Sequence, residues 1–335
     1  MIRKVSLSGF KSFYNRTLDI NRLTLLTGLN SSGKSSVIQA LLMLEKAANK
    51  ENNILLDGHG SIEEIKNNRV KENISLQVRD ENNQSLTATI SLSSNLKIDI
   101  KDTFDYPEII YISANRFGPQ TSIPIYNNSA KQNRIGKNGE NLLQCIELLG
   151  NTVLDECLRH ANAEGDTLEY NIRGWLNTIS PNIGFKFHLE KMSDSSYSMF
   201  DEHRANNVGF GLSYTLPVIT ALLMGTFIKN SLVIIENPEA HLHPKGQTEL
   251  ARLTALCVVA GAQIIVETHS DHFFDGIRIA SKKHGIAEDV QIHWFELNEH
   301  KNTEVYSPIL SEDGRVSEWP KGFFDQFEIN ASELI

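Results

Sequence analysis

The sequence predicts an α/β fold in which helices cover a parallel sheet, with an antiparallel β layer near the N-terminus and an inserted, mainly helical lobe. Apolar runs at 23–27 and 232–235 are each followed by a polar turn and a helical pattern, which is typical of parallel strands. Residues 74–78 and 86–92 alternate between apolar and polar side chains, which predicts antiparallel strands. Apolar residues between 139 and 179 recur at helical spacing and predict the lobe.

The composition indicates the class of protein. The chain has 335 residues, of which 40% are hydrophobic, and this is enough for a substantial core. Its three cysteines are widely spaced in apolar surroundings, so we expect free thiols in a reducing compartment. We find no signal peptide and no apolar stretch of membrane-spanning length, and we expect a cytoplasmic protein without membrane contact. The net charge of -9 argues against a surface that binds phosphate backbones throughout.

The order of the elements divides the chain into four segments. Residues 1–124 hold the N-terminal strands, the first apolar strand with its helix, the antiparallel layer and a buried strand at 109–112. Residues 125–207 form the mainly helical lobe, in which no heptad pattern persists. Residues 208–300 return to alternating helices and strands, and residues 301–335 are expected to pack on the rest as a tail. The two α/β segments are expected to fold together as one core.

A glycine-rich run between the first apolar strand and its helix predicts a nucleotide site. The run from Gly28 to Ser35 fits the pattern GxxxxGK[ST], in which glycines allow backbone N–H groups to converge on phosphate oxygens at a helix N-terminus. Lys34 is expected to reach the β- and γ-phosphates, and the Ser35 hydroxyl to bind Mg²⁺. The candidate binding residues are Gly28, Asn30, Ser31, Ser32, Gly33, Lys34, Ser35 and Ser36.

Two polar clusters follow strands of the last α/β segment and predict further parts of the site. Glu236 comes directly after the strand at 232–235, where a carboxylate suits the organisation of Mg²⁺. The next strand ends in a second polar run at 267–272. A zinc or two-metal site is an alternative, and so is a structural role in turns, for the residues His241, His243, His269, Asp271 and His272. We prefer the nucleotide interpretation because it explains both clusters together.

These motifs, in this order, resemble the ABC-type ATPases of the RecF, SMC and OLD (overcoming lysogenization defect) group, the OLD-like branch above all. Residues 232–244 and 267–270 carry most of the resemblance. Residues 9–13 resemble the opening of SMC heads, and residues 208–217 resemble the signature turn and helix of that branch. Residues 313–325 are similar to the tail of a subgroup of AAA-type ATPases.

The resemblance implies an ABC-type P-loop ATPase head that binds ATP and Mg²⁺. It implies that Lys34 and Ser35 hold phosphate and metal, that Glu236 completes the metal site, and that His269 is the switch residue near the γ-phosphate. Arg116 or Asn115, in the turn after the strand at 109–112, is expected at the position that senses metal and water in relatives.

The resemblance also implies a head-to-head homodimer with two nucleotides between the subunits. Ser213, together with backbone N–H groups around Gly211, is expected to reach the γ-phosphate bound by the partner subunit. This expectation is physically sound because a helix N-terminus offers N–H donors to an anion.

One position departs from the family pattern. These ATPases commonly place a glutamate after the strand-end acid, where this chain has Asn237, and an amide cannot accept a proton as a general base. We expect Glu239 to act as the base from the following turn, together with Glu236 and His269, and turnover to be slow. The alternative is a dimer gated by ATP binding without useful turnover.

The resemblance implies that the ATPase acts on a second protein. We expect the ATPase to regulate a separate effector, a nuclease or a toxin, in anti-phage defence, because the residues after His272 leave no room for the Toprim nuclease of OLD-like relatives. The alternative is an ATP-gated DNA-binding clamp of the RecF type in DNA repair, which keeps nucleic acid as an alternative partner although the acidic charge disfavours it. A third alternative, a monomeric P-loop kinase or GTPase, leaves the turn at Ser213 without a role.

Overall fold

The computed structural model describes residues 1–91, 95–101, 104–125, 134–181, 183–320 and 322–334. The chain forms two compact units. Unit 1 contains Met1–Ile109, Glu288–Ser311 and Val316–Ile335, and unit 2 contains Ile110–Ala287 and Glu312–Arg315. Among the helices of the described residues, none combines the length and the apolar character needed to cross a membrane.

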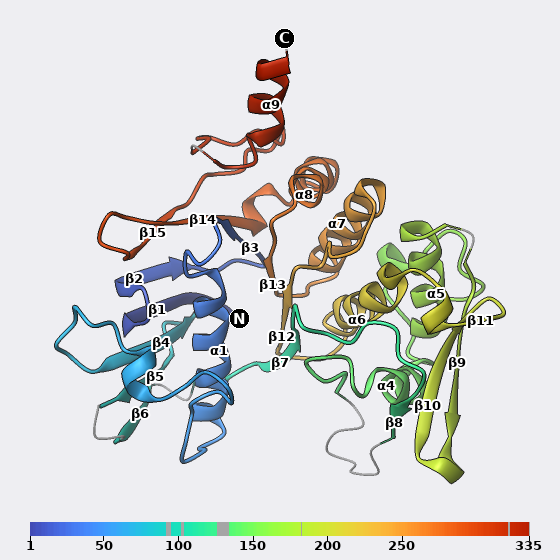
Figure 1. Ribbon diagram of the computed structural model, residues 1–335, viewed down its shortest axis with the longest axis horizontal. Coiled ribbons are helices and arrows are strands. Elements are labelled where there is room, and N and C mark those ends of the chain that lie inside the picture. Colours follow the sequence, from blue (N-terminus) through green and yellow to red (C-terminus); the bar gives the residue numbers. More distant parts are fainter. Residues whose placement is uncertain (92–94, 102–103, 126–133, 182, 321, 335) are drawn as a thin grey trace. The chain divides into compact units, whose positions relative to one another are not determined.

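Unit 1 is built on an antiparallel sheet against which helix α1 (Lys34–Ala48) packs (Figure 1). The five strands run in the order β2-β1-β4-β5-β6. Leu7, Leu76 and Ala88 stand opposite one another on neighbouring strands and are all buried, so one face of the sheet supplies core. The antiparallel layer predicted from residues 74–92 is therefore confirmed. Its strands are β1 (Ile2–Phe10), β2 (Phe13–Asp19), β4 (Ile74–Asp80), β5 (Ser85–Ile90) and β6 (Leu96–Lys101).

Three more strands of unit 1 carry the phosphate loop. Strand β3 (Leu23–Gly28) is buried along its whole length, as its apolar sequence predicts. It runs parallel to β14 (Val290–Leu297), which pairs antiparallel with β15 (Thr303–Tyr306). The C-terminal segment also contributes Phe323, whose buried ring lies 5.4 Å from that of Trp294. Helices α2 (Ile62–Ile65) and α9 (Gln326–Leu334) complete the unit.

Unit 2 contains a parallel strand pair covered by three helices. Strands β12 (Ser231–Glu236) and β13 (Ile264–Glu267) are parallel, with Glu236 opposite Glu267, so their carboxyl ends lie side by side. Strand β7 (Glu108–Ile112) is the other neighbour of β12. Helix α7 packs against both α6 and α8. Their bounds are α6 (Phe210–Met224), α7 (Pro244–Val259) and α8 (Asp271–His284).

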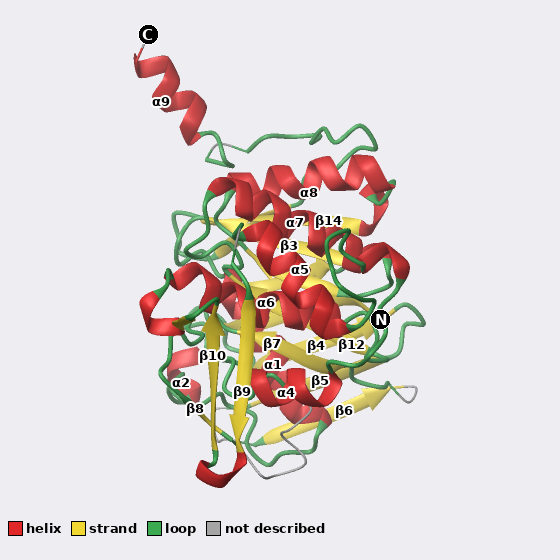
Figure 2. Cartoon of the chain, turned by 90° about the vertical axis from the view of Figure 1, so that its right-hand side faces the viewer, coloured by secondary structure: helices red, strands yellow, loops and turns green. Residues whose placement is uncertain are grey.

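The inserted segment of unit 2 contains the expected helices and, in addition, a small antiparallel sheet. Helices α4 (Leu142–Leu149) and α5 (Leu168–Ile179) agree with the helical spacing of the apolar residues. The sheet consists of β8 (Ile123–Pro124), β9 (Phe185–Glu190), β10 (Ser195–Phe200) and β11 (His203–Arg204), and Figure 2 shows β9 and β10 side by side. The sequence pattern does not reveal this hairpin, because the period-two alternation lasts only six residues in β9. Single-turn helices occur at η1 (Glu156–Leu158), η2 (Lys191–Ser193), η3 (Ala205–Asn207) and η4 (Ala287–Asp289).

Candidate nucleotide site

Two glycines give the phosphate loop of unit 1 its shape. Gly28 has φ 139°, and a Cβ there would lie 2.2 Å from the carbonyl oxygen of Phe295. Gly33 has φ 111°, and a Cβ there would lie 2.6 Å from Oγ1 of Thr303. Both the backbone conformation and the close packing exclude other residues at these positions. The glycines of the sequence motif are therefore explained by local geometry.

Lys34 is the first residue of helix α1 and lies beneath the loop. Its side chain is only 3% exposed, and its ammonium group donates hydrogen bonds to the carbonyl oxygens of Gly28 at 3.1 Å and Leu29 at 2.7 Å. The Ser32 hydroxyl donates to the Leu29 carbonyl at 2.7 Å. Of the other candidate residues, Asn30 and Ser31 are exposed, Ser35 is half-buried and Ser36 is buried. The loop thus gathers a cation and the N-terminus of a helix, which together suit an anionic ligand.

Thr303 supports this loop and was not found by the sequence analysis. Its hydroxyl donates a hydrogen bond to the carbonyl of Ser32 at 2.8 Å and lies 2.6 Å from the hydroxyl of Ser12. Thr303 is 2% exposed, and it is the first residue of β15. A threonine far along the chain carries no motif that could have identified it.

We expect Thr303→Val to loosen the phosphate loop. Valine keeps the shape of threonine but leaves the buried Ser32 carbonyl without its donor, which should lower the free energy of unfolding by about 1–3 kcal/mol. Urea denaturation followed by circular dichroism measures this change. Thr87→Val is the matched control, because Thr87 lies on β5, outside the loop, and its hydroxyl accepts a hydrogen bond from the Gln77 side chain on β4. An equal loss in both variants would contradict a specific role for Thr303.

In unit 2, the carboxylate of Glu236 lies at the end of strand β12. It is half-buried and accepts a hydrogen bond from the backbone N–H of Ala114 at 3.0 Å. Burial raises the pKa of the nearby Tyr111 hydroxyl, and the negative charge of Glu236 raises it further. Glu236 therefore places carboxylate oxygens at a strand end, and oxygen donors are the ligands that Mg²⁺ takes.

Glu239 and His269 meet at the ends of the two parallel strands. The Glu239 carboxylate accepts a hydrogen bond from the backbone N–H of His269 at 2.9 Å. Burial raises the pKa of Glu239, while the hydrogen bonds from His269 and the Thr268 hydroxyl and the charge of Arg116 oppose this rise. His269 itself is exposed. A carboxylate with a raised pKa is a better proton acceptor, as a general base requires.

Asn237 occupies a special backbone position between these acids. Its φ is 45°, in the left-handed region that asparagine tolerates, and its N–H donates to the Glu267 carbonyl at 2.8 Å. Its side-chain oxygen is buried and has no hydrogen-bond partner among the described residues. The asparagine thus fits the turn after the strand.

The Arg116 side chain forms hydrogen bonds with backbone carbonyls. Its guanidinium donates to Tyr214 at 2.8 Å, Glu236 at 2.9 Å, Asn237 at 2.8 Å and Ser113 at 3.2 Å. The side chain is 2% exposed, whereas the neighbouring Asn115 is exposed. Arg116 therefore binds the protein's own backbone, and Asn115 is the member of the expected pair that faces solvent.

Helix α6 begins at an exposed glycine. Gly209 caps the helix and Phe210 is 57% exposed, so the cap and the first residue of the helix face solvent within unit 2. A Cβ at Gly211 would lie 2.7 Å from the carbonyl oxygen of His241, which explains the second glycine. The first backbone N–H groups of a helix have no partner within it.

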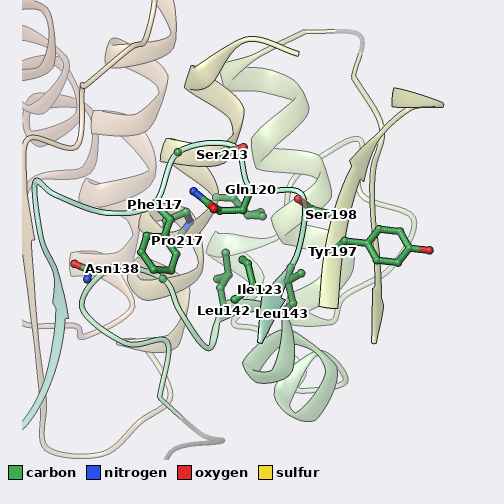
Figure 3. A pocket seen from close by; sticks show the side chains of 13 residues that line it. Phe117, Gln120, Ile123, Asn138, Leu142, Leu143, Tyr197, Ser198, Ser213 and Pro217 are labelled. Atoms are coloured by element: carbon green, nitrogen blue, oxygen red, sulfur yellow. The ribbon is translucent and has the colours of Figure 1, made fainter. Parts of the chain in front are cut away.

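Ser213 lies one turn further on, and its hydroxyl is buried. It lines a pocket with an empty volume of about 420 Å³, together with Gln120, Asn138 and Pro217 (Figure 3). The hydroxyl has no hydrogen-bond partner among the described residues. The Ser213 hydroxyl, expected to join the backbone N–H groups at the start of α6, is therefore buried within unit 2.

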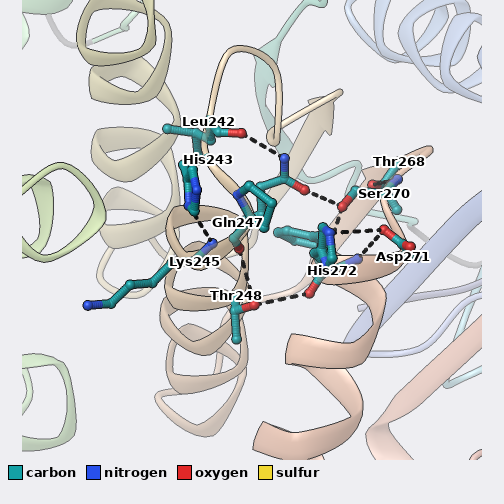
Figure 4. Close-up of polar contacts among 11 residues, drawn as sticks. Leu242, His243, Lys245, Gln247, Thr248, Thr268, Ser270, Asp271 and His272 are labelled. Atoms are coloured by element: carbon teal, nitrogen blue, oxygen red, sulfur yellow. Dashed lines mark hydrogen bonds and ion pairs between the residues drawn. The ribbon is translucent and has the colours of Figure 1, made fainter.

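The remaining histidines of the polar clusters have local structural roles. The Nδ1 atom of His243 accepts a hydrogen bond from the Lys245 N–H and so caps helix α7, and the ring of His241 lies 4.6 Å from that of Tyr214. Figure 4 shows the network beside them, in which the Ser270 hydroxyl binds Gln247 and caps α8. The described residues contain no group of three or more His, Cys, Asp or Glu side chains placed to hold a metal ion. The zinc alternative therefore has no support in this part of the chain.

Solved structures of SMC heads share this fold. An SMC head bound to the C-terminal winged-helix domain of ScpA matches with a TM-score of 0.61 and 14% identity, over 93% of this chain and 98% of that one. An SMC head with a coiled coil and joint from Pyrococcus yayanosii matches with a TM-score of 0.56 and 11% identity, over 100% and 99% of the two chains. An SMC head bound to the C-terminal domain of ScpA from Pyrococcus furiosus matches with a TM-score of 0.54 and 10% identity, over 99% of each chain. These matches show that the chain has the fold of an ABC-type ATPase head.

Family models match nearly the whole sequence. No curated protein matches it significantly. Residues 287–334 match a model described as "Protein of unknown function (DUF3696)", which covers the tail singled out by sequence. Residues 23–275 match a model described as "AAA domain, putative AbiEii toxin, Type IV TA system". This match spans the phosphate loop, the start of α6 and both strand-end clusters, and the chain belongs to this AAA-domain family.

Proposed function

We propose that the chain is a slow ATPase that forms a homodimer around ATP and regulates a separate effector, a nuclease or a toxin, in anti-phage defence. The observation that carries the proposal is the phosphate loop, in which two glycines that admit no side chain bring backbone and the buried Lys34 together at the start of α1. A family of AAA domains with this fold implies a nucleotide, usually with Mg²⁺.

We propose particular residues for the phosphates and the metal. Lys34 carries the positive charge beneath the loop, and its two bonds are to loop carbonyls that a phosphate can replace as partners. The Ser35 hydroxyl and the Glu236 carboxylate are the oxygen donors that we propose for Mg²⁺, which would offset charge on the phosphates when bound. His269 is the residue that we propose to face the γ-phosphate, since it is exposed at the end of β13.

Glu239 is the base that we propose for hydrolysis. It would take a proton from the attacking water, a role supported by its raised pKa and by the fixed position of its carboxylate on the His269 N–H. Turnover would be slow because Asn237 stands where relatives commonly have a glutamate. ATP binding, and not rapid turnover, would then be the main signal.

The start of α6 is the surface that we propose to contact the nucleotide of the partner subunit. Gly209 and Phe210 are exposed there, and the N–H groups of the first turn, including that of Gly211, are suited to an anion. We assign the contact to these N–H groups and not to the Ser213 hydroxyl, which is buried in the pocket.

The effector and the setting rest on the family. Its description names a toxin of a type IV toxin–antitoxin system. A dimer that closes on ATP and opens after hydrolysis provides two states that a second protein can distinguish. The alternative, a DNA clamp of the RecF type, would need a basic surface, and the chain carries a net charge of -9. Strong, salt-sensitive binding of DNA by the isolated chain only with ATP would favour the clamp.

The variant Gly209→Asp tests the proposed dimer. A Cβ at Gly209 would have no heavy atom of the described chain within 4 Å, and its φ of -63° suits any residue, so the fold should tolerate the change. Aspartate is a good helix cap, yet its charge would repel a phosphate of the partner's nucleotide. We expect ATP binding to persist and ATP-dependent dimerisation to require at least about tenfold more protein. Size-exclusion chromatography with light scattering measures the dimer.

Gly209→Asn is the matched control, because it has the same shape without the charge. It should dimerise far better than the aspartate variant. Equal loss in the two variants would contradict a contact with phosphate, and a wild-type chain that stays monomeric with ATP would contradict the proposed function.

A further inference from the structure

Arg116 is a buried cation whose guanidinium forms hydrogen bonds with four backbone carbonyls and with no carboxylate among the described residues. Burial lowers the pKa of its guanidinium to about 10, so it keeps its charge at neutral pH. Removing a charge from water is expensive, and an apolar side chain of similar volume would fill the same space without that cost. Filling space in the core therefore does not explain why an arginine is buried at this position.

The bonds of Arg116 join three separate segments of unit 2. Its Nε atom donates to Tyr214 in the second turn of α6, and its terminal nitrogens donate to Glu236 and Asn237 at the end of β12. It also holds Ser113 in its own loop, and the guanidinium lies 5.1 Å from the centre of the Tyr214 ring. The planar fork of an arginine can serve several acceptors in fixed directions, whereas the ammonium of a lysine cannot.

Arg116 joins the two segments of unit 2 that we propose to contact nucleotide. The end of β12 carries Glu236, and the start of α6, with the exposed Gly209 and Phe210, is the surface proposed for the partner's nucleotide. The negative charges of Glu239 and Glu236 both raise the pKa of Arg116, so the cation also lies in the field of the two acids. The guanidinium that holds α6 at Tyr214 is thus bonded directly to the segment that carries Glu236.

Helix α6 has a weak point just beyond the bond to Arg116. Pro217 lies inside the helix and has no N–H to donate to the carbonyl four residues earlier. The helical segment before this proline is thus less firmly joined to the rest of α6, and kinks are commonly located at such residues. Arg116 holds the helix at Tyr214, on the N-terminal side of Pro217.

We propose that Arg116 is a positioning residue that couples the end of β12 to the first turns of α6, so that nucleotide bound in one subunit sets the surface that receives the partner's nucleotide. This inference rests on the proposed function and adds the means by which binding and dimerisation are linked. It requires no contact between Arg116 and ATP.

The variant Arg116→Lys tests the coupling, because it keeps a positive charge and removes the fork. We expect the affinity for a fluorescent ATP analogue to stay unchanged when it is measured in the Gly209→Asp background, at a protein concentration too low for that variant to dimerise. We expect ATP-dependent dimerisation, measured with Gly209 intact, to weaken by about tenfold, which lies within the usual range of coupling between sites. A purely structural role would instead lower the melting temperature and weaken both processes together.

A second measurement needs no substitution at Arg116. In the Gly209→Asp background, at a protein concentration too low for dimerisation, we expect ATP to change the hydrogen exchange of backbone amides 211–216. Dimerisation of Arg116→Lys at the wild-type ATP dependence, or no change in this exchange when ATP binds, would overturn the coupling alone. Failure of the wild-type chain to bind ATP or to dimerise with it would instead overturn the proposed function, and the coupling with it.

Discussion

Lys34→Met should weaken ATP binding by roughly 10- to 100-fold, because it removes a charge-assisted contact worth about 1.5–3 kcal/mol. Methionine fills the space of the buried lysine stem beneath the loop but provides no donor for phosphate or for the carbonyls of Gly28 and Leu29. If the proposed dimer depends on bound nucleotide, ATP-dependent dimerisation should be lost to the same degree. Equilibrium titration with a fluorescent ATP analogue and light scattering measure the two effects.

Lys46→Met provides a matched control on the same helix. Lys46 lies in the last turn of α1, where its ammonium group donates to the Leu55 carbonyl at 2.9 Å and pairs with Glu51 at 3.4 Å. It lies far along α1 from the loop, so its loss should leave ATP affinity unchanged. If Lys34→Met bound ATP as tightly as Lys46→Met, the phosphate loop could not be the nucleotide site that we propose.

The phosphate loop illustrates what the sequence can predict. An apolar strand, a glycine-rich run and a helix are neighbours in the chain, and their geometry is set by local rules: Gly28 and Gly33 require positive φ, and Lys34 begins the helix. Glu236 was predictable for a similar reason, since it ends a strand of four buried apolar residues. The pattern of the strand fixes where its polar end must lie.

Contacts between distant residues could not be predicted in this way. Thr303 donates to Ser32 across 271 residues of sequence, and Arg116 donates to Asn237 across 121 residues. Neither pair carries a motif, because a backbone carbonyl accepts from any donor that the fold brings to it. The sequence suggested a sensing role for the loop at Asn115 and Arg116, but only the fold shows which of the two side chains is buried.

Ser213 illustrates a limit of another kind. The glycine-rich turn and the apolar helix after it are recognisable, and α6 begins at Phe210 as this pattern indicates. Which residues of the first turns face outward depends on the rotation of the helix about its axis, and α6 is apolar on nearly all sides. Its sequence therefore gives little information about that rotation, and packing places the Ser213 hydroxyl inward.

Glu239→Gln should remove most of the ATPase activity while leaving ATP binding and the dimer intact. Loss of a general base typically lowers the rate by about 10²–10⁴-fold. Glutamine keeps an oxygen that can accept the hydrogen bond from the His269 N–H, so the turn should hold its shape. Phosphate release under single-turnover conditions measures the effect. Glu202→Gln, in an exposed turn of unit 2, is the control, and unchanged phosphate release in Glu239→Gln would exclude Glu239 as the base.

The pH dependence of Glu239 gives a second signature of the same residue. Because burial raises its pKa above the ordinary value of 4.5, the folded protein binds more protons than the unfolded chain between that value and the raised one. The contribution of Glu239 to stability is therefore fully present below pH 4.5 and declines as pH rises through this window. Glu239→Gln should consequently unfold at a higher temperature than wild type at neutral pH, and this difference in melting temperature should shrink on acidification.

The ATPase activity of the wild type should fall over the same pH window as pH decreases, because only the ionised carboxylate can accept a proton from water. A variant that is less stable than wild type at neutral pH would contradict the buried charge on which this argument rests.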